Sequence, residues 1–248
     1  MRIPTLAAAA LVAVLLPAPT QAQQTVARSY SFVPLDGMSA QFEAALKAHL
    51  EWRVENGDPW TWSVSTLEVG EGLGEYGLRT SGHTWADMES YDLDFSPKGL
   101  QHYRATVAPL VKSVSSMITT TNEEMSNRPP TGTALAFVTI TTFHVRPGRQ
   151  AEFAEAAAVA SQALKDAGWP GHWVWATPLS GGGMGPFMQV VALHERMSDM
   201  AEPEPPMLAV LAQAMGQNAF DEWLSDFSES TRGQETIVRR LRPDLSGR

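Results

Sequence analysis

The chain of 248 residues contains no cysteine, so no disulfide can form and the core alone must hold the fold together. A lipid-anchored export signal is excluded as well, because that anchor needs a Cys at the cleavage site. The six histidines form no H-E-x-x-H or paired-His spacing, so we expect no protein-built metal site. No G-x-S-x-G motif is present, which leaves a serine hydrolase of that type without support.

Basic residues are few: 18 Lys and Arg stand against 27 Asp and Glu, and the net charge is −9. Nucleic-acid binding is dominated by neutralisation of phosphates, so we expect no nucleic-acid partner. One concentration of basic residues, Arg239, Arg240 and Arg242, lies near the C-terminus, and we interpret it as a solvated strand end.

Long hydrophobic runs are also missing, apart from Leu6 to Leu16. That run follows Arg2 and precedes Pro17, Pro19 and Ala22, the pattern of a secretory signal peptide. It is far shorter than the roughly 20 residues that a membrane-spanning helix needs. We therefore expect residues 1–22 to be a signal peptide cleaved near Ala22. The rest of the chain is expected to be periplasmic or secreted, with no membrane span.

A block of motifs occurs twice in the sequence. Trp60-Thr61-Trp62, Gly72-Leu73-Gly74 and Trp85-Ala86-Asp87-Met88 return as Trp173-Val174-Trp175, Gly183-Met184-Gly185 and Met197-Ser198-Asp199-Met200. The separations are 113, 111 and 112 residues, and later positions repeat at 120 after an insertion of about eight. This regularity predicts an internal duplication.

Hydrophobic periodicity predicts the order β-α-β-β-α-β in each copy, the ferredoxin-like arrangement. The first unit is predicted at residues 23–126 and the second at 134–248, with a linker at 127–133 that contains Pro129 and Pro130. Gly181 to Gly185 precedes a strand rather than a helix, so we interpret it as a hairpin turn and not as a phosphate cradle.

Two ferredoxin-like units with the W-x-W strand and the glycine hairpin resemble the dimeric α/β-barrel superfamily. The resemblance implies an α+β fold in which two antiparallel sheets pack face to face into a barrel with helices outside. Members include cofactor-free monooxygenases of the antibiotic-biosynthesis type, NIPSNAP-like proteins, stress-responsive barrels and haem enzymes of the chlorite dismutase type. Because the superfamily hosts such different chemistries, the fold alone does not choose among them.

Alternation along the strands of the first unit separates an apolar face from a polar face. The apolar set is Tyr30, Phe32, Trp60, Trp62, Val64, Tyr76 and Leu78, which we expect to pack under the helices. The polar set is Ser29, Ser31, Thr61, Ser63, Ser65, Arg79, Ser81 and His83, which would line the barrel interior. In the second unit the corresponding positions are less polar: Ile140, Thr142, Val174, Ala176, Val191, Leu193 and Glu195.

A cavity with one polar and one mostly apolar wall suits a small organic molecule. We expect Ser63, Arg79, His83 and Glu195 to contact it, although a polar wall that merely holds water explains the same pattern. The alternative function is a cofactor-independent, monooxygenase-like or isomerase-like enzyme. In that case His83 would be the acid or base, and Arg79 would hold an anionic substrate oxygen.

No cofactor is expected, but the resemblance to haem enzymes makes the helical histidines His49 and His102 candidates for a haem ligand. The Trp pairs at 60/62 and 173/175 are interpreted as core, with stacking on a planar ligand as the alternative. The sequence leaves homo-oligomer formation open.

Overall fold

The computed structural model describes residues 25–181 and 185–246. The expected signal peptide at residues 1–22 and part of the second glycine turn, residues 182–184, lie outside the described residues. Within the described ranges, none of the helices combines the length and apolar character needed to cross a bilayer.

The elements follow the predicted order in both halves. The first half contains β1 (Val26–Pro34), α1 (Ser39–Glu55), β2 (Ser63–Val69), β3 (Tyr76–His83), α2 (Trp85–Asp94), α3 (Ser96–Thr106), the 3-10 turn η1 (Ala108–Leu110) and β4 (Val111–Asn127). The second half contains β5 (Phe137–Val145), α4 (Gln150–Asp166), β6 (Trp173–Ser180), β7 (Phe187–His194), the 3-10 turn η2 (Met197–Met200), α5 (Met207–Met215), α6 (Gln217–Ser230) and β8 (Thr231–Leu241).

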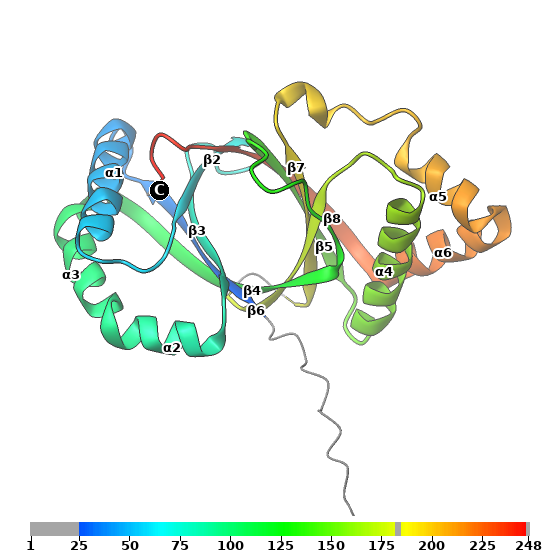
Figure 1. Cartoon of the computed structure of the whole chain (residues 1–248), viewed down its shortest axis with the longest axis horizontal. Helices are drawn as coiled ribbons and strands as arrows, with labels where there is room; N and C mark the ends of the chain where they lie inside the picture. Colours follow the sequence, from blue (N-terminus) through cyan, green and yellow to red (C-terminus); the bar gives the residue numbers. More distant parts are fainter. Residues whose placement is uncertain (1–24, 182–184, 247–248) are drawn as a thin grey trace, which may run out of the picture.

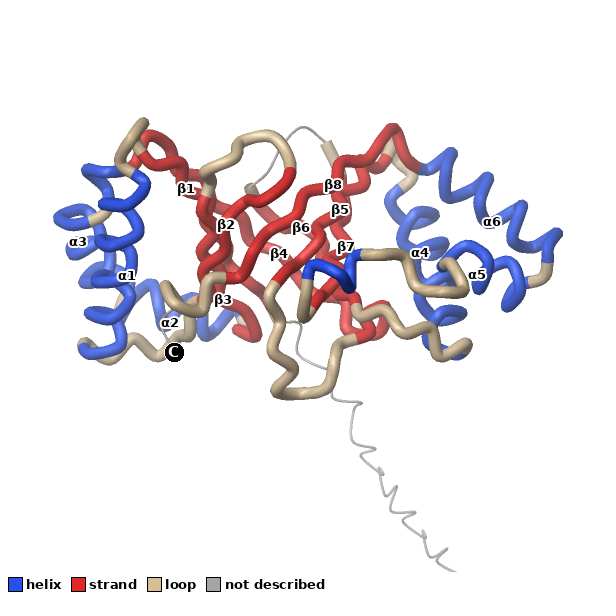
Figure 2. Tube along the Cα trace, turned by 90° about the horizontal axis from the view of Figure 1, so that it is seen from above, coloured by secondary structure: helices blue, strands red, loops and turns tan. Residues whose placement is uncertain are grey.

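All eight strands pair antiparallel in one closed barrel with the order β1-β3-β2-β8-β5-β7-β6-β4. Each half contributes four neighbouring strands, and the halves meet where β2 pairs with β8 and β4 with β6. Helices α1, α2 and α3 cover one side of the barrel and α4, α5 and α6 the other (Figures 1 and 2). The predicted fold of two ferredoxin-like units forming an α/β barrel is therefore confirmed.

The first helix of each half is built in the same way. Gly37 and Gly148, which are 111 residues apart, both adopt positive φ in the turn before the helix, a conformation that suits glycine. Five residues later, Phe42 and Phe153 are both fully buried against the outer face of their sheet. Each half thus has its own core between helices and sheet.

The Trp pairs belong to these two cores rather than to the barrel interior. Trp60 and Trp62 lie in the first core, Trp173 and Trp175 in the second. In the first half a buried carboxylate fixes the pair: Asp58 accepts hydrogen bonds from the Trp60 backbone N–H at 2.9 Å and the Trp62 indole at 3.0 Å. Arg53 balances the charge of Asp58 through an ion pair of 2.6 Å.

The strand registers show which residues of the two W-x-W motifs are equivalent, and they correct the alignment expected from the sequence. Val64 pairs with Leu78, and Trp175 pairs with Val190. Since Leu78 and Val190 are 112 residues apart, Val64 corresponds to Trp175 and Trp62 to Trp173, at a separation of 111. The separation of 113 expected from the motif was wrong by two residues, because the motif begins before β2 but at the first residue of β6.

The end of β4 and the segment that follows β8 both cross into the opposite half. Ser126 Oγ accepts a hydrogen bond from the Trp175 N–H at 3.0 Å, and Ser246 Oγ accepts one from the Val64 N–H at 2.9 Å. Beside these serines, Met125 is buried in the second core and Leu245 in the first. The two crossings are equivalent, because residues 126 and 246 are 120 apart and contact equivalent strand positions.

The C-terminal arginines are not a solvated strand end. Arg239 is only 7% exposed and pairs with Glu75 at 2.7 Å. Arg240 pairs with Glu68, and Arg242 with Glu43. The expectation failed because β8 closes the barrel against β2, which brings first-half carboxylates beside these arginines.

If the crossing segment holds the halves together, Leu245→Ala should destabilise the protein by about 2–4 kcal/mol, the usual cost of truncating a buried leucine. The exposed Leu93, which lies on α2 and is 73% exposed, provides the matched control, and Leu93→Ala should change stability by less than about 0.5 kcal/mol. Urea unfolding monitored by circular dichroism measures both. Equal stability of the two variants would show that the contact made by Leu245 does not stabilise the fold.

Candidate functional site

The inner face of the barrel is polar on the first half, as the sequence predicts. On the second half the predicted apolar positions of β5, β6 and β7 are joined by Glu235 and Arg239 of β8, which pair in register with Thr142 and Val138. Register pairs place Ser29, Ser63, Ser65, Arg79 and Thr119 inside on the first half. On the second half they place Ile140, Thr142, Val174, Ala176, Gln189 and Val191 inside. Strand β7 lies four positions from β3 around the ring, so Arg79 faces the wall that carries Gln189 and Val191.

Two arginines of the described strands face this interior: Arg239 of β8, which pairs with Glu75, and Arg79 of β3. Ser29 and Ser63 sit directly opposite Arg79 on the two neighbouring strands. Its Nη1 donates to Ser29 Oγ at 2.9 Å and lies 3.5 Å from Thr119 Oγ1. Among residues 25–181 and 185–246, no carboxylate forms an ion pair with Arg79. The buried Arg53 and Arg239, by contrast, each have a carboxylate partner.

The environment of Arg79 opposes its charge. Burial, together with the nearby charge of Arg128, lowers the pKa of Arg79 from its ordinary 12.5 to about 10. Arg79 is still protonated at neutral pH, but its charged form is less favourable in the folded protein than in water. A buried cation with a perturbed pKa and no carboxylate partner is a candidate for a site that binds an anion.

The interior beside Arg79 is accessible to solvent. Ser63 points inward and its hydroxyl donates to the Arg79 carbonyl at 3.1 Å, yet Ser63 is classed as exposed and Arg79 as partly exposed. An eight-stranded barrel has an interior that side chains can just fill, or that can hold one small ligand. Ser63 is the first residue of β2, so the accessible end of the interior lies beside Arg79.

His83 does not join Arg79. Between Ala27 and Val26 the β1–β3 register skips Gly82, whose φ of +85° marks a bulge. The extra residue turns His83 to the helix side, where its ring stacks on Trp60 at 4.0 Å and Nε2 lies 2.6 Å from Thr80 Oγ1. A glycine inside a strand pattern signals such a bulge, so Gly82 was the clue in the sequence.

Of the four predicted contacts, only Ser63 and Arg79 therefore come together. Glu195 lies one residue beyond the end of β7 and is exposed. The first wall contains further polar groups that the ligand prediction left out, Ser29 and Thr119.

The two haem candidates face each other between α1 and α3. Their Nδ1 atoms are 2.8 Å apart, and the rings stack at 5.1 Å. Trp52 stacks on His102 at 4.1 Å, and Tyr103 packs against His49, which is 2% exposed. Since His49 is almost fully buried among Trp52, Tyr103 and His102, its ring has no open position for a haem iron, and His49 does not fit an axial haem ligand. Elsewhere in the described chain, no group of three or more His, Asp or Glu side chains could hold a metal ion.

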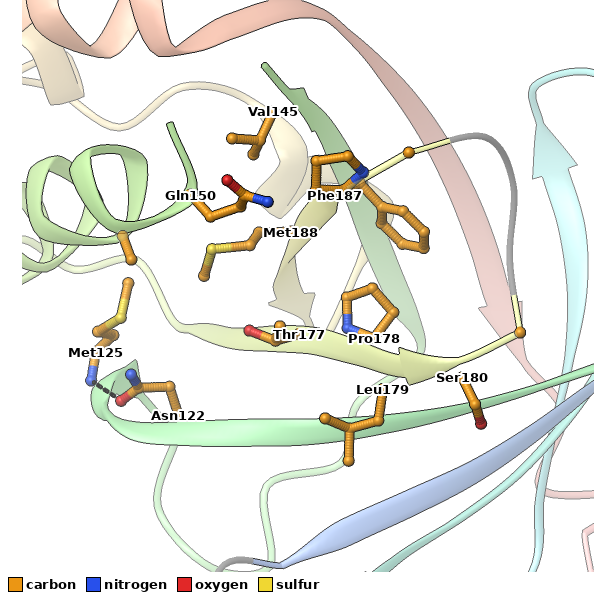
Figure 3. Close-up of a pocket in the computed structure, with 14 residues that line it drawn as sticks. Asn122, Met125, Val145, Gln150, Thr177, Pro178, Leu179, Ser180, Phe187 and Met188 are labelled. Carbon is orange, nitrogen blue, oxygen red and sulfur yellow. Dashed lines mark hydrogen bonds between the residues drawn. The ribbon is translucent and has the colours of Figure 1, made fainter. Parts of the chain in front are cut away.

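Two hollows lie outside the barrel interior, and sequence reasoning missed both. One of about 480 Å³ lies between the start of α4 and strands β4, β6 and β7, lined by Asn122, Gln150, Thr177, Phe187 and Met188 among others (Figure 3). The other, of about 470 Å³, lies beside Trp60, Tyr91 and Lys98.

The fold is shared with solved structures of low sequence identity. Two structures named "putative monooxygenase", from Lactobacillus acidophilus and Fusobacterium nucleatum, match with TM-scores of 0.54 and 0.55. Their identities are 5% and 7%, over 90% and 89% of this chain and 98% and 94% of theirs. A mutant chlorite dismutase from Candidatus Nitrospira defluvii matches with a TM-score of 0.52 and 11% identity, over 88% of this chain and 92% of that one.

The chain has the dimeric α/β-barrel fold. No protein-family model and no curated protein matches its sequence. At these identities the likeness establishes the fold, and the interior of this barrel must be interpreted from its own residues.

The histidine pair gives a stability prediction. Burial, with Arg53 and His102 nearby, lowers the pKa of His49 from 6.5 to about 3, so the fold favours neutral His49. The stability that depends on neutral His49 is complete above pH 6.5 and is lost as the pH falls from 6.5 toward 3. The slope should reach about 1.4 kcal/mol per pH unit.

The free energy of unfolding, measured by urea titration between pH 7 and pH 5, should show this slope in the unmodified protein and in the control His144→Gln, since His144 is partly exposed. In His49→Gln the slope should be much smaller. If the free energy of unfolding changed with pH equally in all three proteins, His49 would be ruled out as the source of the slope.

Proposed function

We propose that the protein binds a small organic anion inside its barrel and that Arg79 contacts the anionic group. The observation that carries the proposal is the lack of a carboxylate partner for Arg79 in an interior that is partly open to solvent. A bound anion would supply the missing counter-charge. Arginine presents a planar fork of donors that matches a carboxylate or a similar oxyanion.

The surrounding walls suggest which part of the ligand lies where. Ser29, Ser63 and Thr119 offer hydroxyls close to Arg79. Val174, Ala176 and Val191 line the second half, so an apolar body would face them. This arrangement favours an amphipathic anion, with its charged group on the first half and its apolar part on the second.

An enzymatic role with His83 as acid or base finds no support in this geometry, because His83 lies on the opposite face of the sheet from Arg79. Arg79 could still polarise a ligand oxygen. We therefore propose binding as the function and assign no reaction.

We further propose that binding takes place outside the cytoplasm, after removal of residues 1–22. The support is the signal-peptide pattern of Arg2, the Leu6–Leu16 run and Ala22. N-terminal sequencing of the protein recovered from the native cell envelope fraction should begin at Gln23. A mature protein that retains Met1 or Arg2 would refute export by this signal.

Benzoate and benzamide provide a matched pair of probes for the anion site, since they differ mainly in charge. Isothermal titration should detect benzoate binding and much weaker benzamide binding. Arg79→Gln should weaken benzoate binding by about ten- to a hundredfold, the equivalent of one hydrogen bond to a charged group. The benzoate affinity of Arg79→Lys should lie between those of the unmodified protein and Arg79→Gln, because lysine keeps the charge but lacks the planar set of donors of a guanidinium. Benzoate binding should also decline as the pH rises through about 10, where Arg79 loses its proton.

Arg104→Gln, at an exposed position on α3, is the control and should bind benzoate normally. Because the fold disfavours the charge of Arg79, Arg79→Gln should not lower the melting temperature. Equal benzoate affinity in Arg79→Gln and the unmodified protein would contradict the proposal.

A further inference from the structure

Because the chain is duplicated, equivalent positions can be compared in the two halves. One such set lies between the start of the first helix of each half, α1 or α4, and the sheet that the helix covers. Strand registers and the crossing segments make Glu43 equivalent to Ala154, Tyr76 to Met188 and Arg242 to Asn122. The separations are 111, 112 and 120 residues, as elsewhere in the repeat. Tyr76 and Met188, for example, both pair with a phenylalanine on the first strand of their half, Phe32 on β1 and Phe143 on β5.

In the first half these positions hold three polar side chains that bond to one another, Glu43, Tyr76 and Arg242, here called the polar plug. Arg242 Nη1 pairs with Glu43 Oε1 at 2.8 Å, and the Tyr76 hydroxyl donates to the same oxygen at 2.7 Å. The hydrogen bond from Arg242 lowers the pKa of Glu43, which keeps the pair charged. Three large side chains therefore occupy the space between α1 and the sheet.

In the second half the equivalent residues leave a cavity. Ala154, Met188 and Asn122 replace the plug, and all three line the hollow of about 480 Å³. Ala154 and Asn122 are much shorter than Glu43 and Arg242, so the space that the plug fills in one half stays open in the other. The volume lies within the range of small-molecule sites.

The lining of this cavity indicates what it would take. None of its described lining residues is charged; Met125, Val145, Pro178, Phe187 and Met188 supply apolar surface. Polar groups come from Asn122, Gln150 and Thr177. In Figure 3 the Gln150 side chain extends from α4 and the Thr177 side chain from β6. Asn122 Oδ1 already accepts from the Met125 N–H at 3.1 Å, which leaves its amide N–H₂ as a donor.

We propose that this cavity is a second binding site, for a small neutral aromatic molecule that bears a hydroxyl or carbonyl group. An anion would find no cation among the described lining residues, and an ionic ligand would lose its hydration without compensation. A planar apolar ligand would pack against Phe187 and the two methionines, whose thioethers adapt to such surfaces. Most of the lining lies on the helix side of the second sheet, with Pro178 and Phe187 at the end of its inner face, and Arg79 is not among the lining residues.

The test uses 1-naphthol as the probe, with isothermal titration on the mature protein. Ala154→Leu extends a side chain into the cavity and should weaken 1-naphthol binding at least tenfold. Ala151→Leu makes the same change one turn earlier on α4, at an exposed position, and should leave binding unchanged. Arg79→Gln should also leave it unchanged, which separates this site from the barrel interior.

Thr177→Val removes one hydroxyl with little change of shape, and should weaken 1-naphthol binding while hardly affecting naphthalene. This variant tests the site even if Ala154→Leu folds poorly. No binding of 1-naphthol by the unmodified protein, or equal binding by it, Ala154→Leu and Thr177→Val, would overturn the proposal.

Discussion

The pairing of β2 with β8 and of β4 with β6 is the constraint on which the rest of this structure depends. A four-stranded antiparallel sheet with helices on one face leaves its other face and both its edges without partners. Joining two such sheets edge to edge removes all free edges and encloses the remaining faces. The crossing segments strengthen both joints, with Ser126 and Met125 at one and Ser246 and Leu245 at the other.

This closure explains why polar residues lie in the middle of the molecule. The helices take the aromatic faces of the sheets, so serine, threonine and arginine on the alternate positions are turned inward. Most buried cations in the chain are matched by carboxylates, as Arg53 is by Asp58 and Arg239 by Glu75. Among the described residues, Arg79 forms no ion pair with a carboxylate, and burial lowers its pKa, so its charge makes the folded state less favourable. This imbalance is the support for the proposed anion site.

The duplication also lets the two halves specialise. Equivalent positions hold the Glu43–Arg242 plug on one side and a cavity on the other, although the backbone pairing is the same. Likewise, the inner wall of the first half carries mainly hydroxyl groups, whereas β5, β6 and β7 of the second half contribute mainly apolar side chains. A homodimer of two identical units would have the cavity, or the polar inner wall, in both units.

Much of this architecture could be predicted from the sequence, because periodicity and repeat spacing depend on local patterns. The element order, the inward position of Arg79 and Ser63 and the core position of the Trp pairs followed from alternation. Other features depend on contacts between distant segments. The partner strand of β8 decided the environment of Arg239, and register decided that Trp62 corresponds to Trp173. His83 changed face because one residue, Gly82, was inserted as a bulge. The cavity at Ala154 could not be foreseen, since it depends on Asn122 arriving from β4 beside α4.

The most direct test of the central claim is a crystal of the protein soaked in sodium iodide, with anomalous scattering used to locate the anions. The account predicts an iodide inside the barrel, within ion-pair distance of the Arg79 guanidinium and beside Ser29 or Thr119. Iodide bound at exposed arginines on the surface with none beside Arg79 would contradict it.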